Sequence, residues 1–342
     1  MKNKGKKKSW IQKLGVAAAL SLVLTGCGSE NPDAQASDTT SVTLMLDYTP
    51  NTNHTGFYVA QHNGYYEAEG LDVEIIEPGD NATTSMVAAG KADFGVSYQE
   101  DVTYALTSED PLPIKTIAAI VQHNTSGFVA LESMGIDSVK DFEGKTYAGW
   151  GAPSEEAVIH AVMNEAGADF DKLTIVGADG SGIAGLSDTT GPNKVNLGWE
   201  FYGWAVIQAQ QAGYKVKYIP LSELDERLDY YTPVIIANDE TLENDPEMVK
   251  KFMAATKKGY EYAIEHPQEA AKILHEDALP DTDLSFLEAS QQYLSAEYAR
   301  DAKSWGLMKD SVWNNYTDFM YECGLIDHKI EARDQYTNAF VQ

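Results

Sequence analysis

Two similar eight-residue segments place polar side chains at equivalent ends of predicted strands. Residues 91–98 and 194–201 each begin with lysine, followed by any residue, an Asp or Asn, an apolar residue and glycine. Each segment reads as a strand that passes into a helix, so Ser97 and Glu200 fall at corresponding carboxyl ends. Ligands of open α/β sheets bind beyond these ends, where hydroxyl and carboxyl groups can hold a small molecule. The repeat predicts two lobes whose edges face one another across a binding site.

Other chemistries are not favoured by the residue types and their spacing. Residues 180–185 match the Gly-x-Gly-x-x-Gly pattern of dinucleotide loops, but no long helix follows them. The seven histidines are scattered without the close helical spacing of a zinc site, and no Gly-x-Ser-x-Gly elbow is present. We therefore expect neither a metal nor a cofactor.

Charge excludes several classes of partner. The chain has a net charge of −27, and its first 26 residues hold six lysines and no acids, so the remainder carries −33. Such a surface repels nucleic acid and anionic lipid headgroups. Only three arginines occur, Arg227, Arg300 and Arg333, which disfavours a clamp for sulfonate, phosphate or nitrate.

The N-terminus is expected to direct the protein across a membrane. A lysine-rich start precedes an apolar run at 14–24, which is shorter than the ~18–20 residues needed to span a bilayer and is typical of a signal peptide over 1–26. The sequence Leu-Thr-Gly-Cys that ends at Cys27 resembles the lipobox of bacterial lipoproteins. We expect a lipidated tether at 27–41 and a protein anchored on the extracytoplasmic face of the cell membrane; the alternative is an uncleaved membrane helix. Cys323 would then have no cysteine partner.

Strand and helix patterns alternate after the tether. Strands are predicted at 42–47, 71–76, 94–97, 114–121, 127–131, 145–149, 173–176, 195–199, 216–219 and 233–237. Helices are predicted at 56–69, 82–89, from Gln99, at 153–165 and 203–212, and in several segments after Asp239. This alternation favours an α/β fold with mostly parallel sheets.

The chain is expected to cross between the lobes twice. The crossings are predicted near 128–132 and 231–235. The first lobe would comprise 42–130 and 233–342, and the second lobe 131–232. Two crossings form a hinge, which allows the lobes to close around a ligand.

The residues around the first predicted helix resemble a known family. Residues 47–56 read Asp-Tyr-Thr-Pro-Asn-Thr-Asn-His-Thr-Gly and residues 64–73 read Gly-Tyr-Tyr-Glu-Ala-Glu-Gly-Leu-Asp-Val. They resemble the family of yeast thiamine-pyrimidine synthases and bacterial pyrimidine-precursor-binding lipoproteins, and 90–97 and 149–155 extend the match over most of 42–240. The family usually has Trp where this chain has Tyr48. The resemblance implies a two-lobe periplasmic-binding-protein fold of type II with a helical C-terminal tail.

The resemblance also implies a flat aminopyrimidine ligand. Within the family, this chain is most similar to lipoproteins that capture N-formyl-4-amino-5-aminomethyl-2-methylpyrimidine for an ABC transporter. Such a ligand needs aromatic faces and a few directional polar groups. The site predicted on this basis consists of Tyr48, Trp150 and Tyr202 as stacking faces, Asn53 as an amide contact supported by His54, hydroxyls from Ser97 and Tyr98, and the carboxyls of Glu155 and Glu200.

Structural alternatives exist for these residues. Asn53 could cap a helix, and Glu155 or Glu200 could be an acid that favours a helix start. The aromatic residues could belong to the core. Glu200 is the foremost candidate, because a carboxyl group can address a ring nitrogen and an exocyclic amine together.

An enzyme is the main alternative from another class. The resemblance implies that a synthase carries a lysine for pyridoxal phosphate and a histidine four residues later, where this chain has Ser97 and Asp101. Without the lysine no Schiff base can form. We expect a monomeric binding protein that serves an ABC permease and its ATPase, without catalysis. Another small solute, such as a sulfonate, nitrate or an amine, remains an open alternative.

Overall fold

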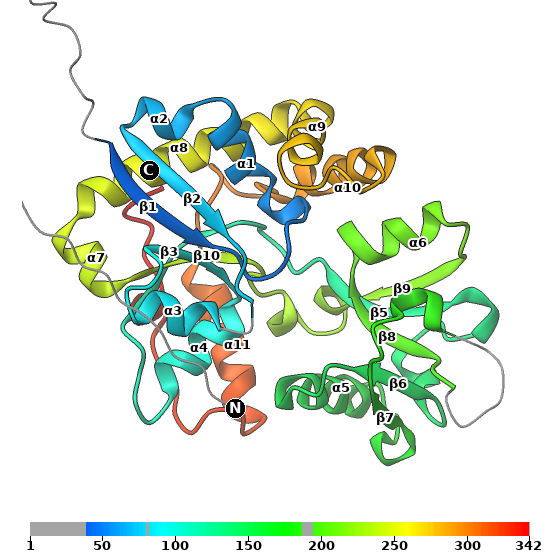
Figure 1. Ribbon diagram of the computed structural model, residues 1–342. Coiled ribbons are helices and arrows are strands. Elements are labelled where there is room, and N and C mark those ends of the chain that lie inside the picture. Colours follow the sequence, from blue (N-terminus) through cyan, green and yellow to red (C-terminus); the bar gives the residue numbers. More distant parts are fainter. Residues whose placement is uncertain (1–38, 80–81, 187–193, 342) are drawn as a thin grey trace, which may run out of the picture. The chain divides into compact units, whose positions relative to one another are not determined.

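The structure is a computed structural model and describes residues 39–79, 82–186 and 194–341. The predicted signal peptide, the lipid site at Cys27 and nearly all of the tether lie outside the described residues. Within those ranges, ten strands form two five-stranded sheets, each flanked by helices (Figure 1).

The first sheet has the strand order β2-β1-β3-β10-β4. Its strands are β1 (Thr40–Met45), β2 (Leu71–Ile76), β3 (Phe94–Ser97), β4 (Ile114–Ala119) and β10 (Val234–Asn238). The second sheet has the order β7-β6-β8-β5-β9. Its strands are β5 (Ser126–Leu131), β6 (Thr146–Gly149), β7 (Thr174–Gly177), β8 (Leu197–Phe201) and β9 (Val216–Pro220).

The two sheets share one topology. In the first sheet, β3 pairs in parallel with β1 and antiparallel with β10. In the second, β8 pairs in parallel with β6 and antiparallel with β5. Four strands of each sheet therefore run in one direction, and the strand that arrives from the other sheet runs in the opposite direction. The predicted two-lobe α/β fold is confirmed, with one antiparallel strand in each sheet.

The chain changes sheet earlier than the predicted boundary at residue 130. It leaves the first sheet after Ala119, and β5 already belongs to the second sheet from Ser126 onward. The apolar residues of β5 explain this, since Phe128 and Ala130 pack into the core of the second sheet.

Helices occupy the remaining regular structure. They are α1 (Thr55–His62), α2 (Tyr65–Ala68), α3 (Thr83–Ala88), α4 (Gln99–Thr107), α5 (Pro153–Glu165), α6 (Ile207–Gln211), α7 (Asp239–Asn244), α8 (Pro246–Glu265), α9 (Pro267–Asp277), α10 (Leu284–Glu297), α11 (Asp310–Glu322) and α12 (Ala332–Gln335). The helical tail after Asp239 and the helix at 153–165 follow the sequence pattern closely.

Two predicted helices are interrupted. The helix predicted at 56–69 is broken between α1 and α2 by Gly64, whose φ of 69° an α-helix cannot accommodate. The helix predicted at 203–212 begins as a π-helical turn (Tyr202–Val206) before α6. Apolar periodicity does not distinguish these variants from one continuous helix.

Apolar side chains fill both faces of each sheet. On the first sheet, Phe94 stacks on Phe252 of α8 with ring centroids 3.8 Å apart. On the second sheet, Phe128 faces the cluster that includes α5, whereas the adjacent Val129 faces the cluster of α6. Tyr316 of α11 packs with the second-sheet cluster, although the tail was predicted to belong to the first lobe. Trp313 of the same helix packs with first-sheet residues such as Val234, so α11 contacts the cores of both sheets.

Candidate functional site

Asp47 organises the polar residues that follow β1 and β3. Its Oδ1 lies 2.6 Å from Nε2 of His54, and its Oδ2 accepts a hydrogen bond from the Tyr98 hydroxyl over 2.6 Å. Nδ1 of His54 accepts the Asn51 N–H, so the ring proton lies on Nε2 and points at Asp47. Burial acts to raise the pKa of Asp47, but the contact with His54 and the two hydrogen bonds outweigh it and lower the pKa.

The polar groups of His54 and Tyr98 therefore form hydrogen bonds within the protein. His54 is fully buried with both ring nitrogens in use, so it fixes the turn before α1 and offers a ligand no free nitrogen. Burial, together with the charge of Asp47, raises the pKa of the Tyr98 hydroxyl far above its ordinary value. Asp47 was not among the predicted residues, although its place two residues after β1 marks the same sheet edge.

The turn before α1 leaves two predicted contacts available. The ring of Tyr48 is 66% exposed. Asn51 caps the short 3₁₀ turn (Thr52–His54), because its side chain accepts the Asn53 N–H over 2.9 Å. The alternative of Asn53 as the cap is therefore wrong. The Tyr260 hydroxyl donates to the Asn53 carbonyl, which fixes the backbone while the side-chain amide forms no hydrogen bond within the described residues.

Glu155 supports the loop that follows β6. Its carboxylate is 2% exposed and accepts the N–H of Gly151 over 2.8 Å, the N–H of Trp150 over 3.2 Å and the hydroxyl of Tyr147. Because its oxygens accept these three hydrogen bonds, the Glu155 carboxylate fixes the conformation of the loop after β6. A Cβ on Gly149 would lie 1.9 Å from this carboxylate, so glycine is required there.

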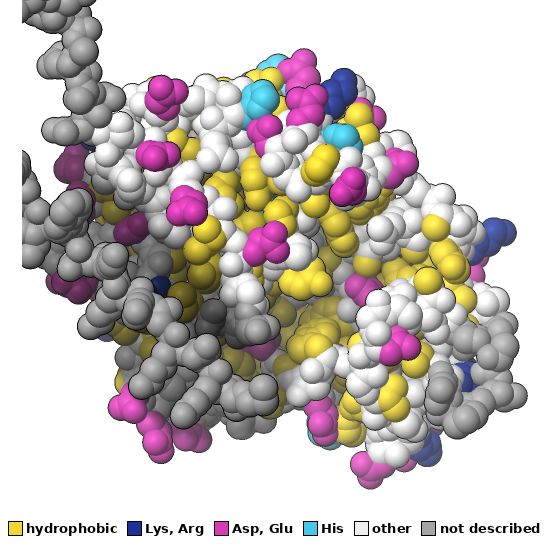
Figure 2. Space-filling view, in the orientation of Figure 1, with side chains coloured by type: hydrophobic (Ala, Val, Ile, Leu, Met, Phe, Trp, Pro, Cys, Tyr) yellow, Lys and Arg dark blue, Asp and Glu magenta, His cyan; other side chains and the backbone are white. Residues whose placement is uncertain are grey.

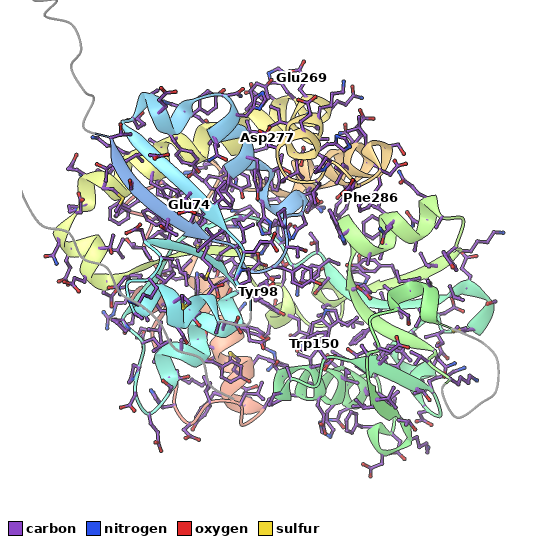
Figure 3. All side chains as sticks on the ribbon, in the orientation of Figure 1. Glu74, Tyr98, Trp150, Glu269, Asp277 and Phe286 are labelled. Carbon is purple, nitrogen blue, oxygen red and sulfur yellow. The ribbon has the colours of Figure 1, made fainter. Side chains whose placement is uncertain are left out.

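The loop held by Glu155 presents an aromatic ring at the edge of the second sheet. Trp150 is 60% exposed, and its ring meets Trp199 edge-to-face with centroids 5.1 Å apart. Phe201, at the end of β8, is 36% exposed at the same edge. Figure 3 shows Tyr98 and Trp150 on the parts of the two sheets that face each other. Phe201 was not among the predicted residues, although it has the place in the second repeated segment that the predicted Tyr98 has in the first.

Glu200 lies on the opposite face of the second sheet from Trp199. It lines a cavity of about 610 Å³, together with Thr146, Ala148 and Ile183 among the described residues. Desolvation raises the pKa of Glu200 to about 6. The carboxylate has no hydrogen bond or ion pair with the described residues, which distinguishes it from Asp47 and Glu155. A group of this kind is available to a ligand.

The two remaining predicted residues, Tyr202 and Ser97, differ in burial and in their neighbours. Tyr202 is half-buried and contacts Tyr218 edge-to-face and Tyr293 at a tilt, with centroid distances of 5.1 and 4.7 Å. Ser97 is 2% exposed at the end of β3, opposite Val234 of β10.

A contact across the two sheets was not predicted. Ser154 of α5 donates to Glu100 of α4 over 2.5 Å, and the Tyr316 hydroxyl donates to the other oxygen of Glu100 over 2.8 Å. Burial is the main cause that raises the pKa of Glu100, and these two hydrogen bonds oppose it. The neighbouring Asp101 is exposed on the surface of α4, yet partial desolvation and the charges of Glu100 and Asp47 raise its pKa to about 6.

The amino-acid sequence matches a known family. The family model described as NMT1/THI5 like matches residues 51–270, which include both strand-to-helix edges. The chain belongs to the NMT1/THI5-like family. This confirms the resemblance on which the site was predicted.

Individual relatives of this NMT1/THI5-like protein differ in activity. It is 31% identical over 265 residues to the formylaminopyrimidine-binding protein of Halalkalibacterium halodurans, a match that covers 74% of this chain and 75% of that protein. It is 25% identical over 313 residues to the 4-amino-5-hydroxymethyl-2-methylpyrimidine phosphate synthase of Legionella pneumophila, covering 90% and 94% of the two chains. Sequence similarity alone therefore does not distinguish a binding protein from an enzyme.

Solved structures confirm the fold of the NMT1/THI5-like chain. A Candida albicans protein with the generic periplasmic binding protein fold superposes with a TM-score of 0.61 at 14% identity, covering 88% of this chain and 97% of that one. In the described ranges, no three His, Cys, Asp or Glu side chains are grouped so that they could hold a metal ion. No helix of the same ranges is long and apolar enough to cross a membrane.

Proposed function

We propose that this protein binds N-formyl-4-amino-5-aminomethyl-2-methylpyrimidine, a thiamine precursor, and delivers it to an ABC permease and its ATPase. Binding is noncovalent and the ligand leaves unchanged. The protein acts as a monomer, tethered through a lipid on Cys27 at the extracytoplasmic face of the cell membrane.

The observation that carries the proposal is a pair of exposed aromatic rings at the carboxyl ends of strands in different sheets. Tyr48 follows β1 and is 66% exposed, and Trp150 follows β6 and is 60% exposed. Exposed rings at the edges where α/β proteins bind ligands provide stacking faces for a flat heterocycle. The Asp47–His54–Tyr98 and Glu155 contacts hold the loops that carry these rings.

Glu200 supplies the directional contact. It is the last but one residue of β8, at the same end of the second sheet as Trp150, and its carboxylate lines the cavity on the face opposite Trp199. A ligand that contacts both residues would therefore extend across this end of the sheet. A carboxylate can accept from an exocyclic amine and from a protonated ring nitrogen at once, and such charge-assisted hydrogen bonds are short and strong. The 31% identity to a formylaminopyrimidine-binding protein supports this choice of ligand.

The charged residues of the protein disfavour an anionic ligand. Arg227 pairs with Asp225 and Glu322, and Arg300 pairs with Glu297. These two arginines are thereby neutralised by acids of the chain. Figure 2 shows acidic side chains scattered over the visible face, few lysines or arginines, and apolar side chains gathered in its middle. A sulfonate or nitrate would find little compensating charge there.

A pyrimidine synthase is the second candidate, because the relatives include such enzymes. The residues at the implied positions do not fit pyridoxal phosphate, since Ser97 and Asp101 stand where a synthase has its lysine and histidine. Incubation with pyridoxal phosphate and borohydride should give no adduct at this edge. A reduced adduct there, or release of a pyrimidine product, would establish the enzyme instead.

The ligand and the anchor have separate tests. Mass spectrometry of small molecules released from purified, denatured protein should detect the formylated aminopyrimidine. Release of a sulfonate or an aliphatic amine would replace the proposed ligand. Cys27→Ser should release the protein from the membrane fraction without changing its affinity, and retention of that variant would indicate an uncleaved helix.

A further inference from the structure

The chain passes between the two sheets through two connections that lie against each other. Residues 120–125 join β4 to β5, and residues 221–233 join β9 to β10. The side-chain amide of Asn124 in the first connection donates to the Leu228 carbonyl in the second over 2.8 Å. Movement of one sheet relative to the other has to change backbone torsions in these connections.

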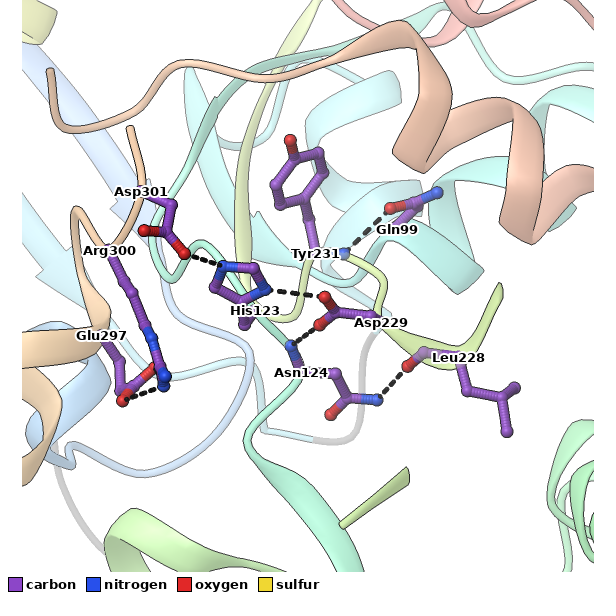
Figure 4. A network of polar contacts seen from close by, with 9 residues as sticks. All are labelled: Gln99, His123, Asn124, Leu228, Asp229, Tyr231, Glu297, Arg300 and Asp301. Atoms are coloured by element: carbon purple, nitrogen blue, oxygen red, sulfur yellow. Dashed lines mark hydrogen bonds and ion pairs between the residues drawn. The ribbon is translucent and has the colours of Figure 1, made fainter. Parts of the chain in front are cut away.

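His123 links the two connections through its side chain (Figure 4). Its Nδ1 lies 2.7 Å from Oδ2 of Asp229, whose other oxygen accepts the Asn124 N–H over 2.9 Å. Its Nε2 lies 3.6 Å from Oδ2 of Asp301, in the segment after α10. One imidazole ring therefore bridges the first connection, the second connection and the chain beyond α10.

Carboxylates at both ring nitrogens favour the doubly protonated ring. A neutral imidazole has one N–H and must present a lone pair to one of the two carboxylates, whereas an imidazolium donates to both. The His123 side chain is 31% exposed and that of Asp229 is 27% exposed, so this pair is only partly screened by water. Asp301 is 74% exposed, which makes the second contact the weaker one.

The other charges near His123 nearly cancel. Arg300 pairs with Glu297 over 3.1 Å, so the positive charge of this neighbouring arginine is neutralised by an adjacent acid. The hydrogen bond to Asp229 is the main cause that raises the pKa of His123; burial and Arg300 act to lower it, and the charges of Asp229 and Glu297 to raise it. The net direction is upward from the ordinary histidine value of about 6.5.

We propose that His123 is a protonation-dependent clasp on the two connections between the sheets. As an imidazolium it holds Asp229 and Asp301 and restrains both connections. When it loses a proton at higher pH, one of the two contacts is lost and the connections become freer to change torsion. Where the binding function proposed above holds, ligand is consequently released faster at alkaline than at mildly acidic pH.

The sign of the effect follows from linkage. A histidine whose pKa is raised by folding contributes stability that is complete below its unfolded pKa of about 6.5 and is lost as the pH rises through the folded value. The clasp is thus closed below about pH 6.5 and opens as the pH rises through the raised pKa of folded His123.

Hydrogen exchange of the ligand-free protein tests the clasp without reference to any ligand. After correction for intrinsic exchange, protection of amides in 120–125 and 221–233 should fall about three- to fivefold between pH 6 and pH 8.5, the scale of a partly exposed ion pair. His123→Gln should show the low protection at both pH values, and His123→Lys the high protection at both. His62→Gln is the matched control, since His62 pairs with Asp277 over 2.9 Å away from the connections, and should behave as wild type.

A second measurement covers variants that fold poorly. The NMR titration of the His123 ring in wild type should give a pKa above 6.5, and Asp301→Asn should lower it. Protection that does not change with pH, a ring that titrates at or below 6.5, or a His123→Gln profile equal to wild type would each overturn the proposal. If the clasp behaves as expected but no aminopyrimidine binds, the binding function fails and the clasp stands.

Discussion

The Ser154 hydroxyl donates to the Glu100 carboxylate over 2.5 Å and so joins the first turn of α5 to the first turn of α4. The two helices follow strands of different sheets, β6 and β3. The contact can form only when the carboxyl ends of the two sheets are close together, which is the arrangement in which a ligand between them would be enclosed.

Ser154→Ala should weaken ligand binding by removing the hydrogen bond that joins α5 to α4. A hydrogen bond to a charged group contributes about 1.5–3 kcal/mol, and part of this is kept by the Tyr316 hydroxyl, so we expect about a tenfold loss of affinity. Titration calorimetry measures it. Ser108→Ala, at the exposed end of α4, is the control; equal affinities for both variants would show that the contact across the sheets has no part in binding.

Glu155→Ala should destabilise the fold. The substitution leaves the Trp150 and Gly151 N–H groups and the Tyr147 hydroxyl without their acceptor, which we expect to cost about 2–4 kcal/mol in urea unfolding. Glu156 is the next residue of the same helix turn and is exposed, so Glu156→Ala should change stability by no more than ~0.5 kcal/mol. Similar effects of the two substitutions would mean that Glu155 is an ordinary first-turn acid.

Glu200→Gln should have opposite effects on binding and on stability. We expect affinity at pH 7 to fall ten- to a hundredfold, because the charge that addresses the ligand is lost. The unliganded protein should become more stable at pH 7, on the order of 1–2 kcal/mol, because burial that raises a carboxyl pKa to about 6 penalises the ionised form. This penalty develops as the pH rises from the unfolded value near 4.3 through about 6, so the gain should vanish at pH 4.

Thermal melts at the two pH values, with the exposed Glu223→Gln as control, check the stability half of this prediction. A Glu200→Gln variant that melts lower than wild type at pH 7 would identify Glu200 as a structural residue.

Trp150→Ala should weaken binding without loss of stability. Stacking on a heterocyclic base contributes about 1–3 kcal/mol, so affinity should fall about ten- to a hundredfold. The ring is 60% exposed and little packing is lost. Tyr321→Ala removes another exposed ring, 45% exposed on α11, and should bind as wild type; if it binds as weakly as Trp150→Ala, the stacking role is refuted.

The fold was largely predictable because its signals are local. The repeat at 91–98 and 194–201 placed Ser97 and Glu200 at strand ends, where β3 and β8 in fact end or nearly end. The site was less predictable, because it depends on pairings between distant residues. Asp47 and Glu100 are defined by partners 51 and 216 residues away, which no local spacing reveals.

The face of the sheet toward which a side chain points was also hard to predict from the sequence. Sequence places Glu200 and Trp199 together, yet successive strand residues point to opposite faces, so the two line different sides of the second sheet. Likewise, Asn51 and Asn53 are the same residue type two positions apart, and the structure shows that Asn51, in an extended backbone conformation, is the one that caps the turn.

Titration calorimetry of the purified protein with N-formyl-4-amino-5-aminomethyl-2-methylpyrimidine tests the central claim most directly. We expect saturable one-to-one binding that is tighter than for an alkanesulfonate or nitrate and is weakened at least tenfold by Glu200→Gln and by Trp150→Ala. No measurable heat with the pyrimidine, together with saturable binding of a sulfonate that both variants retain, would contradict it.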